Sequence, residues 1–154
     1  MRSVSIHLLD TDLAAVEGTL AAAGFERISA ERHRWSYPPG TNPVLYLSCQ
    51  PYTLDADLPE EHEDIIRFTE GKTPTVWVHC DISGRAAGDA EVRHLVETLL
   101  SSHRGIAFDD YTSLAHGWTL DEIRRGELVD EIGFFDGPGY IRREQARRDS
   151  GDRH

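Results

Sequence analysis

The chain has few cysteines and lacks a long apolar run. Its 154 residues include only two cysteines, Cys49 and Cys80. They fall in different predicted strands without a paired spacing, so the sequence predicts neither a disulfide framework nor a zinc knuckle. Met1 is followed by Arg2 and an alternating segment, not by a continuous apolar stretch, and no later segment is long enough to cross a bilayer. We therefore expect a cytoplasmic protein that does not associate with membranes.

Signature catalytic motifs are also missing. The sequence contains no GxGxxG after a strand, no GxxxxGK[ST] and no GxSxG. His79 and Cys80 are adjacent, but neighbouring residues of a strand point to opposite faces, so His79 cannot readily activate the Cys80 thiol. These absences favour a binding function over an enzymatic one without excluding an enzyme, and we expect no cofactor.

Basic residues are scarce relative to acidic ones. The chain has 27 acidic and 16 basic residues, a net charge of −11 at pH 7. Residues 142–154 hold five arginines and three acids, so residues 1–141 carry 24 acids and 11 bases, a charge of −13. Such a surface repels phosphate backbones and attracts basic proteins. The charge predicts a basic protein partner and no nucleic acid, although solubility alone explains it equally well.

The clearest structural unit is a strand followed by a helix. In residues 75–82, TVWVHCDI, polar and apolar residues alternate, so one face enters a core while Trp77, His79 and Asp81 share the other face. Residues 89–103 then carry an apolar stripe at helical spacing. This unit is expected to form the centre of the fold.

The remaining segments add further strands and helices. Residues 3–9 alternate and place His7 on the polar face, and residues 13–23 have helical spacing. Residues 25–49 predict a hairpin with a long loop. Residues 60–70 allow either a helix or a strand, and we favour the helix slightly.

The order of these elements predicts the fold class. It is typical of an α+β, two-layer sandwich, ferredoxin-like or related, with a mainly antiparallel sheet and two helices on one face. Thr119 and Glu122 match a capping box, so a short helix should begin there and end at Gly126. We expect one domain over residues 1–141, with a turn at its end, followed by a polar, frayed tail over residues 142–154.

The open face of the predicted sheet is the first candidate site. If the strands over residues 3–9 and 75–82 are neighbours, as they are in a ferredoxin-like sheet, His7 and His79 approach each other, with Asp81 and His116 nearby. Imidazoles and carboxylates can bind a metal or form an acid/base pair, so this face suits a small enzyme or a metal-binding or small-molecule-binding protein. The same face is also available for a homodimer contact. Half-exposed strand residues without a chemical role explain the pattern more simply.

A loop rich in functional groups is the second candidate. Asp109, Asp110 and Tyr111 are followed closely by Trp118. Such a loop can bind a ligand or a partner. The alternative, which we favour, is that Tyr111 and Trp118 anchor the loop in the core while an aspartate caps a turn.

The third candidate is an acidic run that must lie at the surface. Its carboxylates can attract a basic protein, with exposed aromatic residues as anchors. A solvated acidic loop is an equal alternative. The candidate anchors are Trp35, Tyr37, Tyr52, Trp77, Tyr111 and Trp118. The acids of this run are Asp55, Asp57, Glu60, Glu61, Glu63 and Asp64.

Two stretches carry a resemblance to known proteins. PTVWVHCDISGR, followed by a helix and then by GIAFDDYTSLAHGWTLDEI, resembles small uncharacterised bacterial proteins and the immunity proteins of polymorphic-toxin systems. The resemblance covers roughly the second half of the chain. It implies an acidic single domain that binds a cognate toxin and blocks it, and it supplies no catalytic residues.

Overall fold

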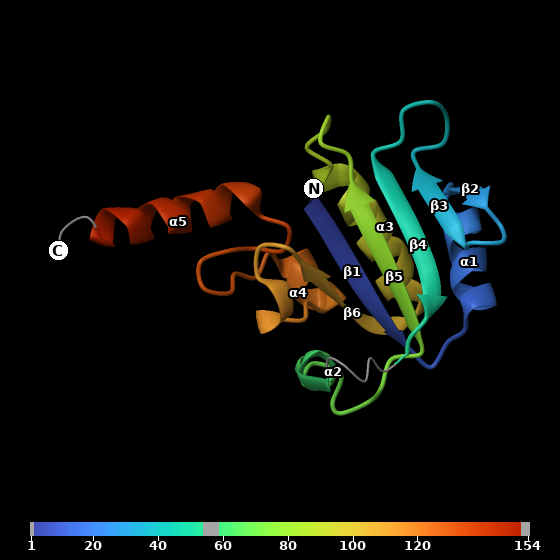
Figure 1. Ribbon diagram of the computed structural model, residues 1–154, viewed down its shortest axis with the longest axis horizontal. Helices are drawn as coiled ribbons and strands as arrows, with labels where there is room; N and C mark the ends of the chain where they lie inside the picture. The colour runs from blue at the N-terminus through green and yellow to red at the C-terminus, as the bar shows by residue number, and fades with distance from the viewer. Residues whose placement is uncertain (1, 54–58, 152–154) are drawn as a thin grey trace.

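The computed structural model describes residues 2–53 and 59–151, which fold into a sheet with helices packed on it (Figure 1). In chain order the elements are β1 (Arg2–Leu9), α1 (Leu13–Ala22), β2 (Glu26–Ser29), β3 (Arg34–Tyr37), β4 (Leu45–Pro51), α2 (Pro59–Ile66), β5 (Val76–Ile82), α3 (Asp89–Ser102), β6 (Arg104–Asp109), the 3-10 helix η1 (Ser113–Ala115), α4 (Leu120–Arg125) and α5 (Gly137–Gly151).

The sheet confirms the predicted α+β, two-layer fold class. Its strand order is β2-β3-β4-β5-β1-β6, and every pairing is antiparallel. β1 and β4 are therefore parallel to each other on either side of β5, and β5 and β6 are parallel on either side of β1. α1 precedes β4 and α3 precedes β6. The strands β4-β5-β1-β6 and these two helices thus have the split βαβ connections of a ferredoxin-like fold, which the β2–β3 hairpin extends at one edge.

The main core lies on the face of the sheet that α1 and α3 cover, which we call the helix-covered face. β1 and β5 direct their predicted apolar residues to it, and all of these are buried. Asp12 caps α1 by accepting a hydrogen bond from the backbone N of Ala15 at 2.8 Å. The buried stripe of α3 is the predicted one and consists of Val92, Leu95, Val96 and Leu99.

The opposite side of the sheet, which we call the second face, is partly covered by α2 and η1. The helix favoured for residues 60–70 is confirmed by α2. Ile65 of α2 packs with Ile106 and Phe108 of β6, and Leu114 of η1 borders this small cluster. Beyond that cluster the second face is open, and Tyr46 is 39% exposed.

The predicted turn and frayed tail are wrong for residues 137–151, which form α5 (red in Figure 1). The reason lies in Asp136, which accepts a hydrogen bond from the backbone N of Gly139 at 2.9 Å and so starts a helix. Pro138 is tolerated in the first turn because that turn has no partner for its missing N–H. By contrast, α4 begins with the predicted capping box at Thr119 and ends at Gly126.

No helix within the described ranges combines the length and the hydropathy needed to span a membrane.

Candidate functional site

A row of aromatic and imidazole rings crosses the second face. His7 of β1 stacks on Trp77 of β5 with ring centroids 6.2 Å apart, and Trp77 meets His79 edge-on at 5.9 Å. On its other side His7 meets Tyr52 edge-on at 5.6 Å. The Tyr52 hydroxyl and Nδ1 of His62 in α2 are 2.9 Å apart and share a hydrogen bond. The row therefore connects the open part of the second face to α2.

His7 is buried, although the sequence predicted that it lies on the open face of the sheet. The strand alternation was read correctly, but α2 and its neighbours cover this end of the second face, and His7 is only 4% exposed. Phe108 packs edge-on against its ring at 5.4 Å. Burial lowers the pKa of His7 to about 4, so the ring is neutral at pH 7. Its Nδ1 has no hydrogen-bond partner among the described residues.

His79 and Asp81 lie together on the open part of the face. His79 Nε2 lies 3.1 Å from Asp81 Oδ1, and the two side chains are 36% and 44% exposed. β1 and β5 are neighbours, as the site required, with Ser5 opposite His79 and Trp77 opposite His7. Nevertheless, no three His, Cys, Asp or Glu side chains of residues 2–53 and 59–151 are placed to hold a metal ion. The structure therefore does not bring His7, His79 and Asp81 together as a metal site.

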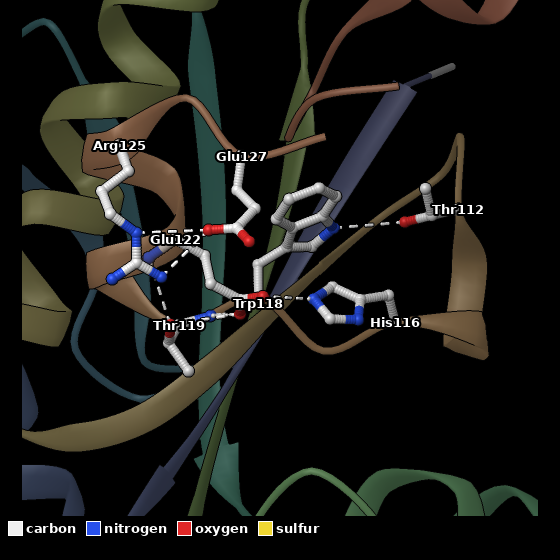
Figure 2. Close-up of polar contacts among 7 residues, drawn as sticks. All are labelled: Thr112, His116, Trp118, Thr119, Glu122, Arg125 and Glu127. Atoms are coloured by element: carbon white, nitrogen blue, oxygen red, sulfur yellow. Dashed lines mark hydrogen bonds and ion pairs between the residues drawn. The ribbon is translucent and has the colours of Figure 1, made fainter. Parts of the chain in front are cut away.

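His116 belongs to a separate network that ties η1 to α4 (Figure 2). Its Nε2 lies 2.9 Å from Glu122 Oε2, while Glu122 Oε1 accepts a hydrogen bond from the backbone N of Thr119 at 2.9 Å. Partial burial acts to raise the pKa of Glu122, but the Thr119 hydrogen bond and the His116 ring together lower it below its ordinary value. The sequence showed His116 and the capping box separately, and the structure shows that they share one carboxylate.

At the end of β6 and in the loop after it, two of the four predicted partner-binding residues are buried in the interior. Asp109 is buried and accepts hydrogen bonds from the backbone N of Thr112 at 2.9 Å and of Phe135 at 2.6 Å. Trp118 is fully buried, and its Nε1 donates to Thr112 Oγ1 at 3.3 Å (Figure 2). Neither Asp109 nor Trp118 can therefore contact a partner, which corrects the predicted surface. Asp110 is exposed.

Four of the predicted acids, Glu60, Glu61, Glu63 and Asp64, lie on α2. The first three are exposed, and Asp64 is half-buried and pairs with Arg67 at 3.1 Å. The predictions for Asp55 and Asp57 fall outside the described residues.

The predicted surface is not a single patch. Asp110 accepts a hydrogen bond from the backbone N of Ser3 at the start of β1, and Tyr111 packs beside Tyr140 of α5 at 5.4 Å. α2 lies toward the other end of β1 (Figure 1). The acids of α2 therefore form one group, and the Asp110 region forms another.

Among the predicted anchors, Trp35 is buried on the helix-covered face and Tyr37 packs there against Phe25 at 4.7 Å. Tyr46 is a better candidate for an anchor because it is exposed, and the sequence analysis did not name it. It lies on the second face opposite Asp81. The alternation of β4 between buried and polar residues was a sufficient signal for its orientation.

No family model, no curated protein and no solved structure matches this chain. The resemblance to immunity proteins therefore stays a prediction.

Proposed function

We propose that the protein is an interaction module of the immunity type, which binds and neutralises a basic protein. The observation that carries this proposal is the position of the acidic helix α2, which lies on the second face and is linked to its open part by the row of rings from His62 to His79. Negative charge on the same face as exposed aromatic and imidazole groups suits a cationic partner, because charge speeds the encounter and a few anchors supply most of the affinity.

The open part of the second face has the side chains that protein interfaces favour. Tyr46 and His79 present flat rings with polar ends, and Asp81 can accept hydrogen bonds from a basic side chain. These groups lie outside the main core, so they can be used for contact without exposing it. The ring row from His79 to His62 runs between this area and the acids of α2.

The charge contribution of α2 can be tested with purified protein and the product of a neighbouring gene that encodes a basic toxin candidate. The variant Glu60→Gln/Glu61→Gln/Glu63→Gln removes three exposed charges without adding a new one. The matched control is Glu31→Gln/Glu91→Gln/Asp121→Asn, which removes three charges from the β2–β3 turn, α3 and α4. Its Glu91 and Asp121 occupy first helical turns, as Glu60 and Glu61 do.

We expect the α2 variant to weaken binding about tenfold at low salt, mostly through a slower association rate, and to reduce the dependence of Kd on salt. The control should bind like the unmodified protein. Equal effects of the two variants would show that net charge acts, not a localised surface. The absence of salt-sensitive binding to any such product would contradict the proposal, and so would stoichiometric metal that is lost in His79→Ala.

A further inference from the structure

Helix α5 projects away from the sandwich (Figure 1). Its first part is held to the body, since Tyr140 packs on Tyr111 and Arg143 pairs with Asp130 at 3.0 Å. Arg147 reaches the same aspartate at 3.7 Å. A polar helix of about 15 residues is marginally stable in water without packing. We therefore expect the side of α5 that does not contact the body to be stabilised by packing on another surface.

The side of α5 that faces away from Asp130 contains one large apolar group. α5 carries four arginines and two acids, whereas the rest of the protein is strongly acidic. Because Arg143 and Arg147 are held by Asp130 and Glu144, the charged residues left for another contact are Arg142, Arg148 and Asp149. Ile141 is 57% exposed. Arg142 is adjacent to Ile141, and Arg148 lies two turns further along on the same side as Ile141. α5 thus presents an isoleucine accompanied by arginines.

A groove of about 500 Å³ lies where α3, α4 and residues 133–136 meet. Gly133 is one of the residues that line this groove. Leu128, which is 62% exposed, lies beside Gly133. The one basic residue of the lining, Arg93, is already paired with Glu97 at 3.3 Å. The groove therefore combines an apolar floor with an acidic rim. Its floor includes Val92, Ile123 and Phe134, and its rim includes Asp89, Asp136 and Glu127, the last of which is paired with Arg125 at 3.0 Å.

We infer that α5 of one molecule docks in this groove of a second copy of the chain. Ile141 would lie on the apolar floor, and Arg142 and Arg148 would face the rim carboxylates. α5 begins at Gly137, directly after the segment that lines the groove. Because arm and groove adjoin in each molecule, two copies can exchange their arms about a twofold axis, which gives a closed dimer instead of an open chain. This inference does not depend on the proposed function.

The test is sedimentation velocity on the full chain across a range of protein concentrations, at low and at high salt. We expect a dimer that dissociates more readily at high salt, because exposed charge pairs are screened. Ile141→Asp should weaken dimerisation at least tenfold. Ile28→Asp is the matched control, because Ile28 is also a large exposed apolar residue but lies on β2. It should leave the dimer unchanged.

A charge exchange locates the contact. Arg142→Glu/Arg148→Glu on the arm and Asp89→Arg on the rim should each weaken the dimer, and a mixture of the two proteins should restore it, since both interfaces of the mixed dimer then pair opposite charges. Since these side chains are exposed, the variants should fold, which circular dichroism checks. A monomer at all concentrations, a dimer that Ile141→Asp leaves intact, or a monomer whose groove binds a basic peptide instead would each overturn the inference.

Discussion

The two faces of the sheet differ in what their side chains can do, and β5 shows the difference within a single strand. Toward the helix-covered face it directs Val76, Val78, Cys80 and Ile82, all of them buried. Toward the second face it directs Trp77, His79 and Asp81, which are all partly exposed. One face of β5 therefore stabilises the main core, and its other face exposes polar groups to solvent.

The two cysteine thiols of the helix-covered face are buried. Burial, assisted by the charge of Glu17, raises the pKa of the Cys49 thiol to about 12, and burial also raises the pKa of Cys80. Both thiols are therefore protonated and unreactive at pH 7. Of the two faces of β5, the second face is therefore the one that has polar groups with exposed surface.

The largest effect should come from the helix-covered face. Leu95 is fully buried in α3, and Leu95→Ala should cost about 4 kcal/mol of unfolding free energy, because it leaves a cavity in the main core. Urea denaturation followed by circular dichroism measures this loss. A cost below about 1 kcal/mol, the level of a surface change, would break the distinction between the two faces.

Asp109 should come next, because it supports the loop that joins β6 to η1. Asp109→Ala should cost about 3 kcal/mol, since several buried backbone N–H groups lose their acceptor. Asp110→Ala, in the adjacent but exposed position, is the control and should cost about 1 kcal/mol or less. If denaturation showed that Asp109→Ala and Asp110→Ala lose the same unfolding free energy, burial would not explain a difference between these two carboxylates.

The covered end of the second face should show a pH effect centred on His7. Its pKa is about 4 in the folded protein and near 6.5 in the unfolded chain, so the unfolded chain binds more protons between these values. Stability should therefore fall as pH drops from about 6.5 to 4, with His7 contributing a loss of about 2 kcal/mol at pH 5. His7→Phe should remove this contribution.

Urea denaturation of both proteins at pH 7 and pH 5 separates His7 from the other groups. His103, whose pKa is lowered by burial, leaves a smaller slope of the same sign in both proteins. Parallel losses in the wild-type protein and in His7→Phe would contradict the assignment to His7.

The open end of the second face should matter least for stability. His79→Thr removes an exposed pair with Asp81 but keeps good strand propensity, so it should change the unfolding free energy by less than about 0.5 kcal/mol. Thermal unfolding detects this. A loss of about 2 kcal/mol would mean that the open end supports the fold as much as the covered end does.

Local patterns were sufficient to predict much of the fold. The alternation in β1 and β5, the stripe of α3 and the Thr119–Glu122 capping box each depend on residues close in sequence, and each was confirmed. α5 was missed because Gly137 and Gly139 resemble a turn, and only the hydrogen bond to Asp136 shows that a helix begins there.

The candidate site was harder to predict from the sequence, because it depends on contacts between distant segments. Alternation identified the face of His7 but could not show that α2 covers it. The structure alone reveals that Asp109 faces inward to accept hydrogen bonds from residues as distant as Phe135.

We propose that the open part of the second face binds a partner while the helix-covered face maintains the fold. The most direct measurement compares the melting temperature of Tyr46→Thr/His79→Thr, and its affinity for the basic partner, with those of the control Ile28→Thr. We predict that the double variant melts within about 4 °C of the unmodified protein and binds at least tenfold more weakly, while the control retains its affinity. Unchanged affinity in the double variant, or a loss of stability that accounts for the weaker binding, would contradict the claim.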